Sequence, residues 1–197
     1  MRWARAATRA PSGAGDDAAL WAIDLEMTGL DPAVDHIIEV AAVPIRGRRI
    51  RLGEAWSTRI RPERYRPNGT VAHQLMPVDL ADGAEAVAAL DALWQVVGDD
   101  ALLFHFASID IGFLQVLHER IGRPWPRPAV VDTLDLLERR NRRRRQVGDG
   151  ELPLQLDAAR AALGLPAHDS HRALGDAVAT AELWLALTAA DAAHRDR

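Results

Sequence analysis

The fold is decided by the stretch Leu20-Trp21-Ala22-Ile23-Asp24-Leu25-Glu26, a short apolar run that is followed by Thr28-Gly29. Such a run predicts a buried β-strand, and the Thr-Gly pair predicts where it stops. Asp24 and Glu26 are two residues apart, so their side chains point to the same face of the strand. Two like charges on a buried face repel each other and resist the loss of water, so this pair predicts a cation between them. An exposed edge strand with two solvated acids is the alternative, which the apolar neighbours disfavour.

Apolar periodicity on the C-terminal side of this strand predicts a single α/β domain. The predicted strands cover residues 37–45, 50–60, 101–105 and 129–131, and the predicted helices cover residues 84–97, 109–121, 133–140, 154–163 and 173–190. The first three strands follow one another as a meander, and neither a repeat nor a domain boundary interrupts the pattern. We therefore expect one domain over residues 19–190, a disordered tail at 1–18 and a short tail at 191–197.

The composition excludes several classes of protein. With 197 residues, of which 48% are hydrophobic and 26% charged, the chain has the length and composition of one globular domain. It has no cysteine, which excludes disulfides, thiolate zinc sites and cysteine nucleophiles. No apolar run approaches the ~20 residues that cross a bilayer, and the first residues lack the apolar core of a secretory signal. We therefore expect a cytoplasmic protein without a membrane partner.

The charge pattern bears on nucleic acid as a partner. A net charge of −4 argues against a simple electrostatic binder, but it is compatible with an enzyme that concentrates carboxylates at a metal site. All basic residues are arginine, clustered at 46–51, 59–66 and 139–145. We interpret the first two clusters as solvated loops. The third is dense enough to contact phosphates, and a disordered segment is its alternative.

Two further acids stand near predicted helix starts. Asp110 follows the strand predicted at 101–105, and Asp176 ends the segment His171-Arg172-Ala173-Leu174-Gly175-Asp176. Taken singly, each acid is explained as well by stabilisation of a helix N-terminus. Taken together, several carboxylates suit Mg²⁺ or Mn²⁺ rather than zinc, and a histidine that titrates near neutral pH can deprotonate a water molecule. Two such cations are the usual device for phosphodiester cleavage.

Three motifs in the expected order resemble the DEDDh exonucleases, whose best-known member is the proofreading epsilon subunit of bacterial DNA polymerase III. They are Asp24-Leu25-Glu26-Met27-Thr28-Gly29-Leu30, His105-Phe106-Ala107-Ser108-Ile109-Asp110 and His171-Arg172-Ala173-Leu174-Gly175-Asp176. The resemblance extends over residues 21–187 and includes Val131-Asp132-Thr133-Leu134 between the second and third motifs. It implies a ribonuclease H-like fold, in which helices surround a mixed sheet.

The same resemblance implies a metal-dependent 3′→5′ exonuclease domain. Its substrate would be the 3′ end of a nucleic acid, with single-stranded DNA expected, and its products nucleoside 5′-monophosphates. His171 would act as general base. The implied ligands of two divalent cations, Mg²⁺ or Mn²⁺, are Asp24, Glu26, Asp110 and Asp176. The implied substrate contacts are Met27, Thr28, His73 and Phe106. A polymerase partner is compatible with the resemblance, but no segment of the sequence indicates one.

Two alternatives stay open. The first motif, continued by Leu30-Asp31-Pro32, is also similar to that of oligoribonucleases, which act on short RNA, whereas the third motif favours the epsilon branch. Phe106 stands where the family usually has Asn, and Ile109 stands where it usually has Phe. These departures affect the grip on substrate, and they leave open a non-catalytic nucleic-acid-binding module on the same fold.

Overall fold

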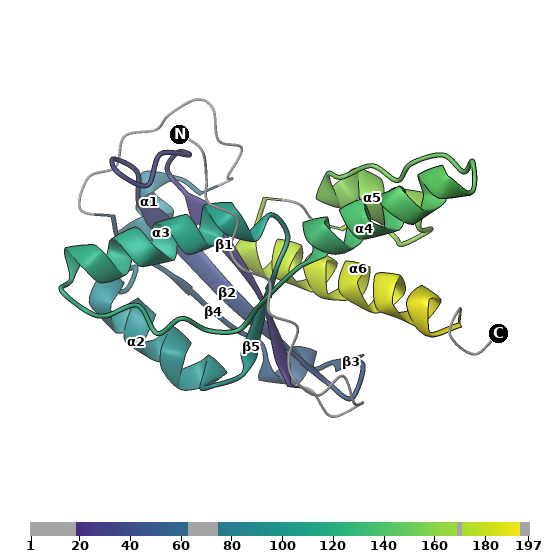
Figure 1. The fold of residues 1–197 in the computed structure, drawn as a ribbon. Coiled ribbons are helices and arrows are strands. Elements are labelled where there is room, and N and C mark those ends of the chain that lie inside the picture. The colour runs from purple at the N-terminus through teal and green to yellow at the C-terminus, as the bar shows by residue number, and fades with distance from the viewer. Residues whose placement is uncertain (1–18, 63–74, 169–170, 194–197) are drawn as a thin grey trace.

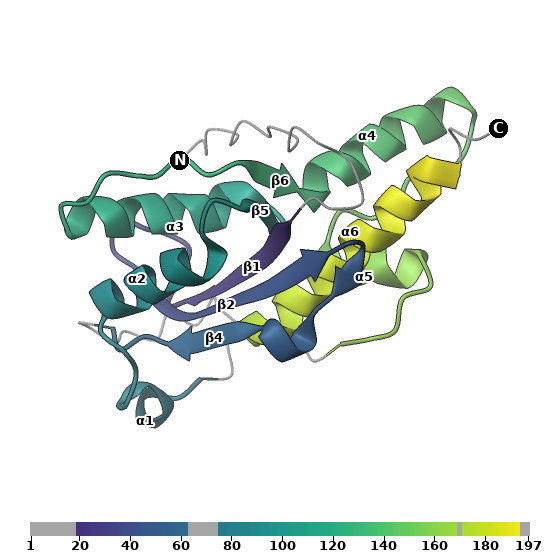
Figure 2. The same cartoon turned by 90° about the horizontal axis from the view of Figure 1, so that it is seen from below.

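The computed structural model describes residues 19–62, 75–168 and 171–193. Its centre is a mixed sheet with the strand order β3-β2-β1-β5-β6, and β4 also pairs with β2. The strands are β1 (Leu20–Met27), β2 (Ile37–Arg46), β3 (Arg49–Ile50), β4 (Trp56–Arg59), β5 (Ala101–Phe104) and β6 (Val130–Asp132). The helices are α1 (Pro77–Leu80), α2 (Ala86–Val97), α3 (Ala107–Arg120), α4 (Thr133–Gln146), α5 (Leu156–Ala162) and α6 (Ala173–Ala193). Helices α2 and α3 cover one face of the sheet, and α6 covers the other with α4 and α5 beside it (Figures 1 and 2).

The central strand β1 is covered on both faces. Ile23 and Leu25 belong to the core under α2 and α3, whereas Ala22 belongs to the core under α6. Because side chains alternate along a strand, Asp24 and Glu26 continue the series that faces α6. The pairing with β2 is antiparallel, and the pairing with β5 is parallel. The predicted alternation of β1 therefore sets the face on which the carboxylates lie.

Small side chains let α6 approach that face closely. Ala173, Ala177 and Ala181 recur every fourth residue on one side of α6, and each is fully buried. They pack in one cluster with Ala22 of β1 and Ala41 of β2. An alanine stripe against alanines of the sheet brings the helix backbone near the strands. This close approach carries the first turn of α6 to the acidic half of β1.

The prediction of one continuous strand over residues 50–60 is wrong. The structure has two short strands there, β3 and β4, which are separated by a 3₁₀ turn at Leu52–Glu54. Ile50 pairs with Ile45 of β2 and Trp56 pairs with Ala42, so the residues from 50 to 56 face only the β2 residues from 45 to 42. A continuous strand would pair one residue with each residue of β2. The segment between residues 50 and 56 has more residues than the part of β2 opposite it, so the surplus forms the turn.

Helix α4 is longer than predicted. It continues past 140 through the arginine run to Gln146, since arginine is a good helix former. Asn141 fastens the helix, because its side-chain amide donates to the Leu152 carbonyl and accepts from the Leu152 amide, both at 2.8 Å. Arg145 pairs with Glu151 at 2.9 Å. The run is thus an ordered helix with acidic neighbours, so the alternative of a disordered segment is not borne out.

Helix α6 reaches Ala193, beyond the expected domain end at residue 190. The tail predicted at 1–18 and residues 194–197 lie outside the described residues. Within the described ranges, no helix is long and apolar enough to cross a membrane.

Candidate metal centre

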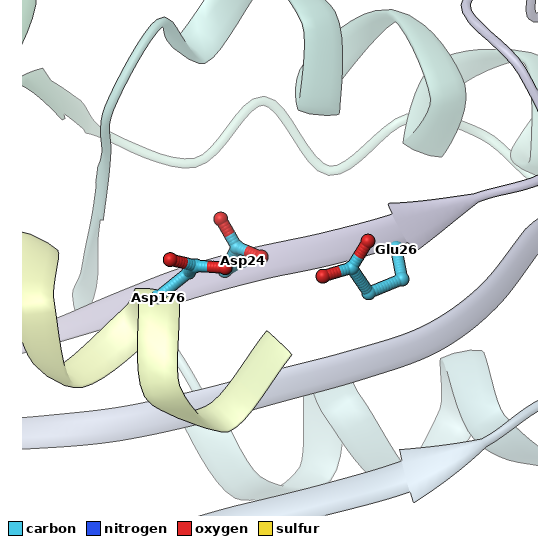
Figure 3. Close-up of side chains that lie close together, drawn as sticks. All are labelled: Asp24, Glu26 and Asp176. Carbon is cyan, nitrogen blue, oxygen red and sulfur yellow. The ribbon is translucent and has the colours of Figure 1, made fainter. Parts of the chain in front are cut away.

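Three carboxylates from two elements converge on the α6 face of the sheet. Asp24 and Glu26 come from the second half of β1, and Asp176 comes from the first turn of α6. One oxygen of each lies within 4.8 Å of the others. Figure 3 shows Asp24 and Asp176 close together, with Glu26 farther along the strand. Oxygen donors at this spacing suit a hard divalent cation, so the structure brings together three of the four carboxylates predicted as ligands.

The fourth carboxylate, that of Asp110, reaches the cluster from the side of β5. Strand β5 pairs with β1 only from Leu20 to Ala22. Beyond that point Asp110 lies in the first turn of α3, where the backbone amide of Leu25 opposes the rise in its pKa. Asp110 is 7% exposed, and it lies outside the 4.8 Å group, but its charge acts on Asp24. It is therefore a close electrostatic neighbour of the cluster.

The carboxylates raise one another's pKa values. Burial raises the pKa of Asp24 well above its ordinary value, and the charges of Asp110 and Asp176 raise it further. Burial raises the pKa of Glu26 to about 7, the charge of Asp176 adds to the rise, and the positive charge of Arg172 opposes it. The pKa of Asp110 is also raised, first by burial. Clustered, partly desolvated carboxylates of this kind are stabilised when a cation binds between them, so the donor set fits a divalent metal.

Glu39 is a buried acid to which the sequence analysis assigned no role. It lies directly opposite Glu26 in the register of β1 and β2. Its carboxylate accepts hydrogen bonds from the Arg172 guanidinium at 3.3 Å and from the Ala173 amide at 3.1 Å. These bonds tie the start of α6 to β2 and so help to place Asp176 beside β1. The available signal was a single acid within an apolar predicted strand.

Asp132 is a second unassigned acid, and it holds the loop of the second motif. Its carboxylate accepts hydrogen bonds from the amides of Phe106 at 3.0 Å and Ala107 at 2.9 Å, and it also caps α4 through the Leu134 amide. Phe106 has a left-handed backbone with a φ of 66°, a conformation that Asn tolerates better than a bulky residue does. Its side chain is 43% exposed. The motif thus presents an exposed aromatic ring on a strained backbone.

The histidines occupy different environments. His171, the predicted base, is exposed, and its backbone amide donates to Asp176 Oδ2 at 2.9 Å. The His168 ring contacts Asp176, with its Nε2 2.7 Å from Asp176 Oδ1. Burial lowers the pKa of His105 to about 4, so this ring is neutral at physiological pH. His73, predicted as a substrate contact, lies outside the described residues.

The loop after β1 is closed by side chains of the first motif. The Thr28 hydroxyl donates to Asp35 Oδ1 at 3.2 Å and accepts from the His36 amide at 3.0 Å. A Cβ on Gly29 would lie 2.2 Å from Asp35 Oδ2, so a larger residue would have to displace the Asp35 carboxylate from its hydrogen bonds to the Thr28 hydroxyl and the Asp31 amide. Met27 and Thr28, both predicted as substrate contacts, are buried. The hydroxyl of Thr28 is therefore used within the loop.

Comparison with known proteins gives consistent matches over most of the chain. A family model described as Exonuclease matches residues 21–184. A PolC-type DNA polymerase III of Thermotoga maritima is 31% identical over 173 residues, which cover 86% of this chain and 12% of that protein. A DNA polymerase III subunit epsilon-like protein of Rhodobacter capsulatus is 34% identical over 169 residues, which cover 83% of this chain and 23% of that protein. The chain thus spans a minor part of the length of these relatives.

Solved structures share the fold. A zinc-bound complex of E. coli exonuclease I with single-stranded DNA superposes with a TM-score of 0.75 at 20% identity, covering 88% of this chain and 41% of that one. The apo form of exonuclease I gives a TM-score of 0.72 at 18% identity, covering 88% and 42%. These likenesses confirm the predicted ribonuclease H-like fold, with its mixed sheet between helices.

Proposed function

We propose, because the chain belongs to the exonuclease family, that it is a metal-dependent 3′→5′ exonuclease acting on single-stranded DNA and releasing nucleoside 5′-monophosphates. The family predicted from the three motifs is confirmed. The observation that carries the proposal is the carboxylate cluster of Asp24, Glu26 and Asp176. The cluster lies in a chain that shares the fold of exonuclease I, and the solved structures of exonuclease I include complexes with single-stranded DNA.

The donor set fits two Mg²⁺ or Mn²⁺ ions. Asp24, Glu26 and Asp176 would hold one ion, and Asp24 together with Asp110 would serve the second. When bound, such ions supply an activated water and stabilise the leaving oxygen of a phosphodiester. The raised pKa values of Asp24, Glu26 and Asp110 support this assignment, because clustered carboxylates of this kind lower their free energy when cations bind.

The remaining groups of the site bind substrate and move a proton. His171 takes the proton of the attacking water, and its exposed ring can pass that proton to solvent. Its backbone bond to Asp176 supports this role, because it keeps the residue next to the cluster. The exposed ring of Phe106 offers a face on which a base can stack. Met27, Thr28 and His73 stay predicted contacts with the terminal nucleotide, although Met27 and Thr28 are buried in this structure.

The test is a digestion series with end-labelled oligonucleotides. Single-stranded DNA, duplex DNA and dinucleotide RNA are each incubated with Mg²⁺, Mn²⁺ or chelator, and products are resolved by length and identity. The proposal expects metal-dependent release of nucleoside 5′-monophosphates from the 3′ end of single-stranded DNA. A strong preference for dinucleotide RNA would favour the oligoribonuclease alternative. Binding of single strands without any metal-dependent hydrolysis would favour the non-catalytic module.

Asp24→Asn is the matched control for this series. The substitution keeps the size of the side chain and removes one charge from the cluster, so it separates hydrolysis by this site from a contaminating nuclease. Activity that survives unchanged in Asp24→Asn would contradict the assignment of the site. Adding a polymerase to the digestion is not needed for this test, because the proposal concerns the domain alone.

A further inference from the structure

His168 lies outside the three motifs, yet its ring contacts Asp176. The ring is 11% exposed and stands between two carboxylates. Its Nε2 lies 2.7 Å from Asp176 Oδ1, and its Nδ1 lies 3.3 Å from Asp157 Oδ1. Asp157 belongs to α5 and Asp176 to α6, so the ring bridges the two helices across the edge of the metal centre.

The loop that carries His168 is fixed just before it. Arg160, which is 2% exposed, donates to the Pro166 carbonyl at 2.9 Å and to the Ala179 carbonyl of α6 at 2.8 Å. The same guanidinium pairs with Glu182 at 2.7 Å. Pro166 is two residues from His168, so a buried bridge between α5 and α6 sets the path of this loop. The position of the ring is therefore built into the fold.

The carboxylate of Asp176 is held at both oxygens. Oδ1 accepts from the His168 ring, and Oδ2 accepts from the His171 backbone amide at 2.9 Å. An aspartate in the first turn of a helix can otherwise rotate about two side-chain bonds. Bonds at both oxygens restrict that rotation and aim the carboxylate toward Asp24, as Figure 3 shows. Metal ligands are commonly oriented by such partners, and the loss of one typically weakens metal affinity.

We propose that His168 is a positioning residue, which orients the Asp176 carboxylate as a metal ligand while Asp157 orients the ring. The inference rests on the proposed function only for the class of ion, a divalent cation. The alternative is competition, in which the His168 ring occupies an Asp176 oxygen that the cation needs. In that case, removing the ring would strengthen metal binding. The sign of the change in affinity therefore decides between positioning and competition.

The experiment measures the affinity of the protein for Mn²⁺ without nucleic acid, from the electron paramagnetic resonance of free Mn²⁺. Two variants of similar polarity are compared. In His168→Gln the amide nitrogen reaches the place of Nε2, so Mn²⁺ affinity should stay within about 3-fold of wild type. In His168→Asn the shorter side chain does not reach Asp176, so affinity should fall about 10-fold or more. His36→Ala is the control, since the ring Nδ1 of His36 contacts Arg120 and the substitution should leave the affinity unchanged.

A second readout separates positioning from a general structural defect. If His168 acts through Asp176, turnover by His168→Asn should need more Mn²⁺ but return near the wild-type value when Mn²⁺ is saturating. Asp157→Asn should weaken affinity less than His168→Asn, because Asp157 acts one contact farther away and is 65% exposed. Equal affinities for the Gln and Asn variants, or tighter binding in either, would overturn the proposal.

The positioning role of His168 and the proposed nuclease activity can fail independently of each other. If wild-type protein binds Mn²⁺ and His168→Asn binds it less tightly, the positioning role holds even when no nucleic acid is degraded. If wild type degrades DNA and His168→Asn binds Mn²⁺ as wild type does, the positioning role fails while the nuclease stands.

Discussion

Two charged centres that both involve α6 are built in opposite ways. At one, the buried guanidinium of Arg160 meets Glu182 and two backbone carbonyls through its Nη1 and Nη2 groups, so the chain itself supplies the opposite charge. At the other, Asp24, Glu26 and Asp176 gather with like charge, and their repulsion adds to burial in raising pKa values. The difference indicates which centre serves the fold. A centre completed within the chain stabilises it, whereas a centre of like charges is completed by a cation from outside.

The largest effect should follow from Asp24→Asn. We expect nucleotide release to fall at least about 1,000-fold, because the substitution removes a ligand shared by both proposed cations. The metal-free protein should not lose stability, since one source of repulsion disappears. Nucleotide release measures the loss of activity, and urea unfolding in the presence of chelator measures the stability of the metal-free protein. A large loss of stability would show that Asp24 stabilises the fold, which would contradict the contrast between the carboxylate cluster and the Arg160 centre.

The second prediction concerns the centre that is completed within the chain. Arg160→Met should lower the free energy of unfolding by roughly 3 kcal/mol, because it leaves Glu182 and two carbonyls unpaired in a partly buried site. Urea unfolding measures this effect. The double variant Arg160→Met with Glu182→Leu should recover part of the loss, since no charge is then stranded. Wild-type stability in the single variant would contradict the assigned role of Arg160.

The third prediction is that a rise in pH lowers the stability of the metal-free protein and raises its affinity for Mn²⁺. The folded pKa of Glu26 is about 7, above its ordinary value of 4.5, so the folded state holds this proton more tightly than the unfolded state does. The metal-free protein should therefore lose stability as pH rises from about 4.5 to about 7. Mn²⁺ affinity should rise over the upper part of that window, about 10-fold per pH unit for each proton released.

Unfolding in chelator and Mn²⁺ titration at pH 6 and pH 8 measure the two trends. Glu26→Gln serves as the control, because it removes the carboxyl whose pKa is raised and should flatten both trends. A metal affinity that does not change between these pH values would contradict the raised pKa of Glu26.

The smallest effect concerns the backbone beside the metal centre. Phe106→Asn should stabilise the protein by about 1 kcal/mol, because Asn tolerates the left-handed conformation at this position. Phe106→Ala removes the same ring without relieving the backbone, so it is the matched control. Thermal unfolding of both variants measures the difference. Equal stability of the two variants would mean that the backbone strain contributes nothing.

The part of the site that lies on one strand could be predicted from the sequence. Asp24 and Glu26 follow from alternation along β1, because the period of a strand assigns each residue to a face. The ordered motifs correctly indicated the family and the fold. Asp176 lies in the cluster with Asp24 and Glu26, whereas Asp110 lies outside this group.

Contacts between distant segments could not be predicted in this way. Periodicity assigns a face but not a partner, so the bonds from Glu39 to the start of α6 and from Asp132 to the second motif were not foreseen. The role of His168 could not be predicted either, because a histidine in a loop carries no periodic signal. The break between β3 and β4 depends on the register with β2, which the local sequence does not contain.

The central claim is that the carboxylate cluster is completed by a divalent cation, and thermal unfolding with and without Mn²⁺ at pH 8 tests it most directly. At Mn²⁺ about 100 times its dissociation constant, binding adds about 2.7 kcal/mol to the folded state. That should raise the Tm of the wild-type protein by roughly 5–10 °C. We predict this rise in wild type and little or none in Asp24→Asn. No rise in wild type, or an equal rise in both proteins, would contradict the account.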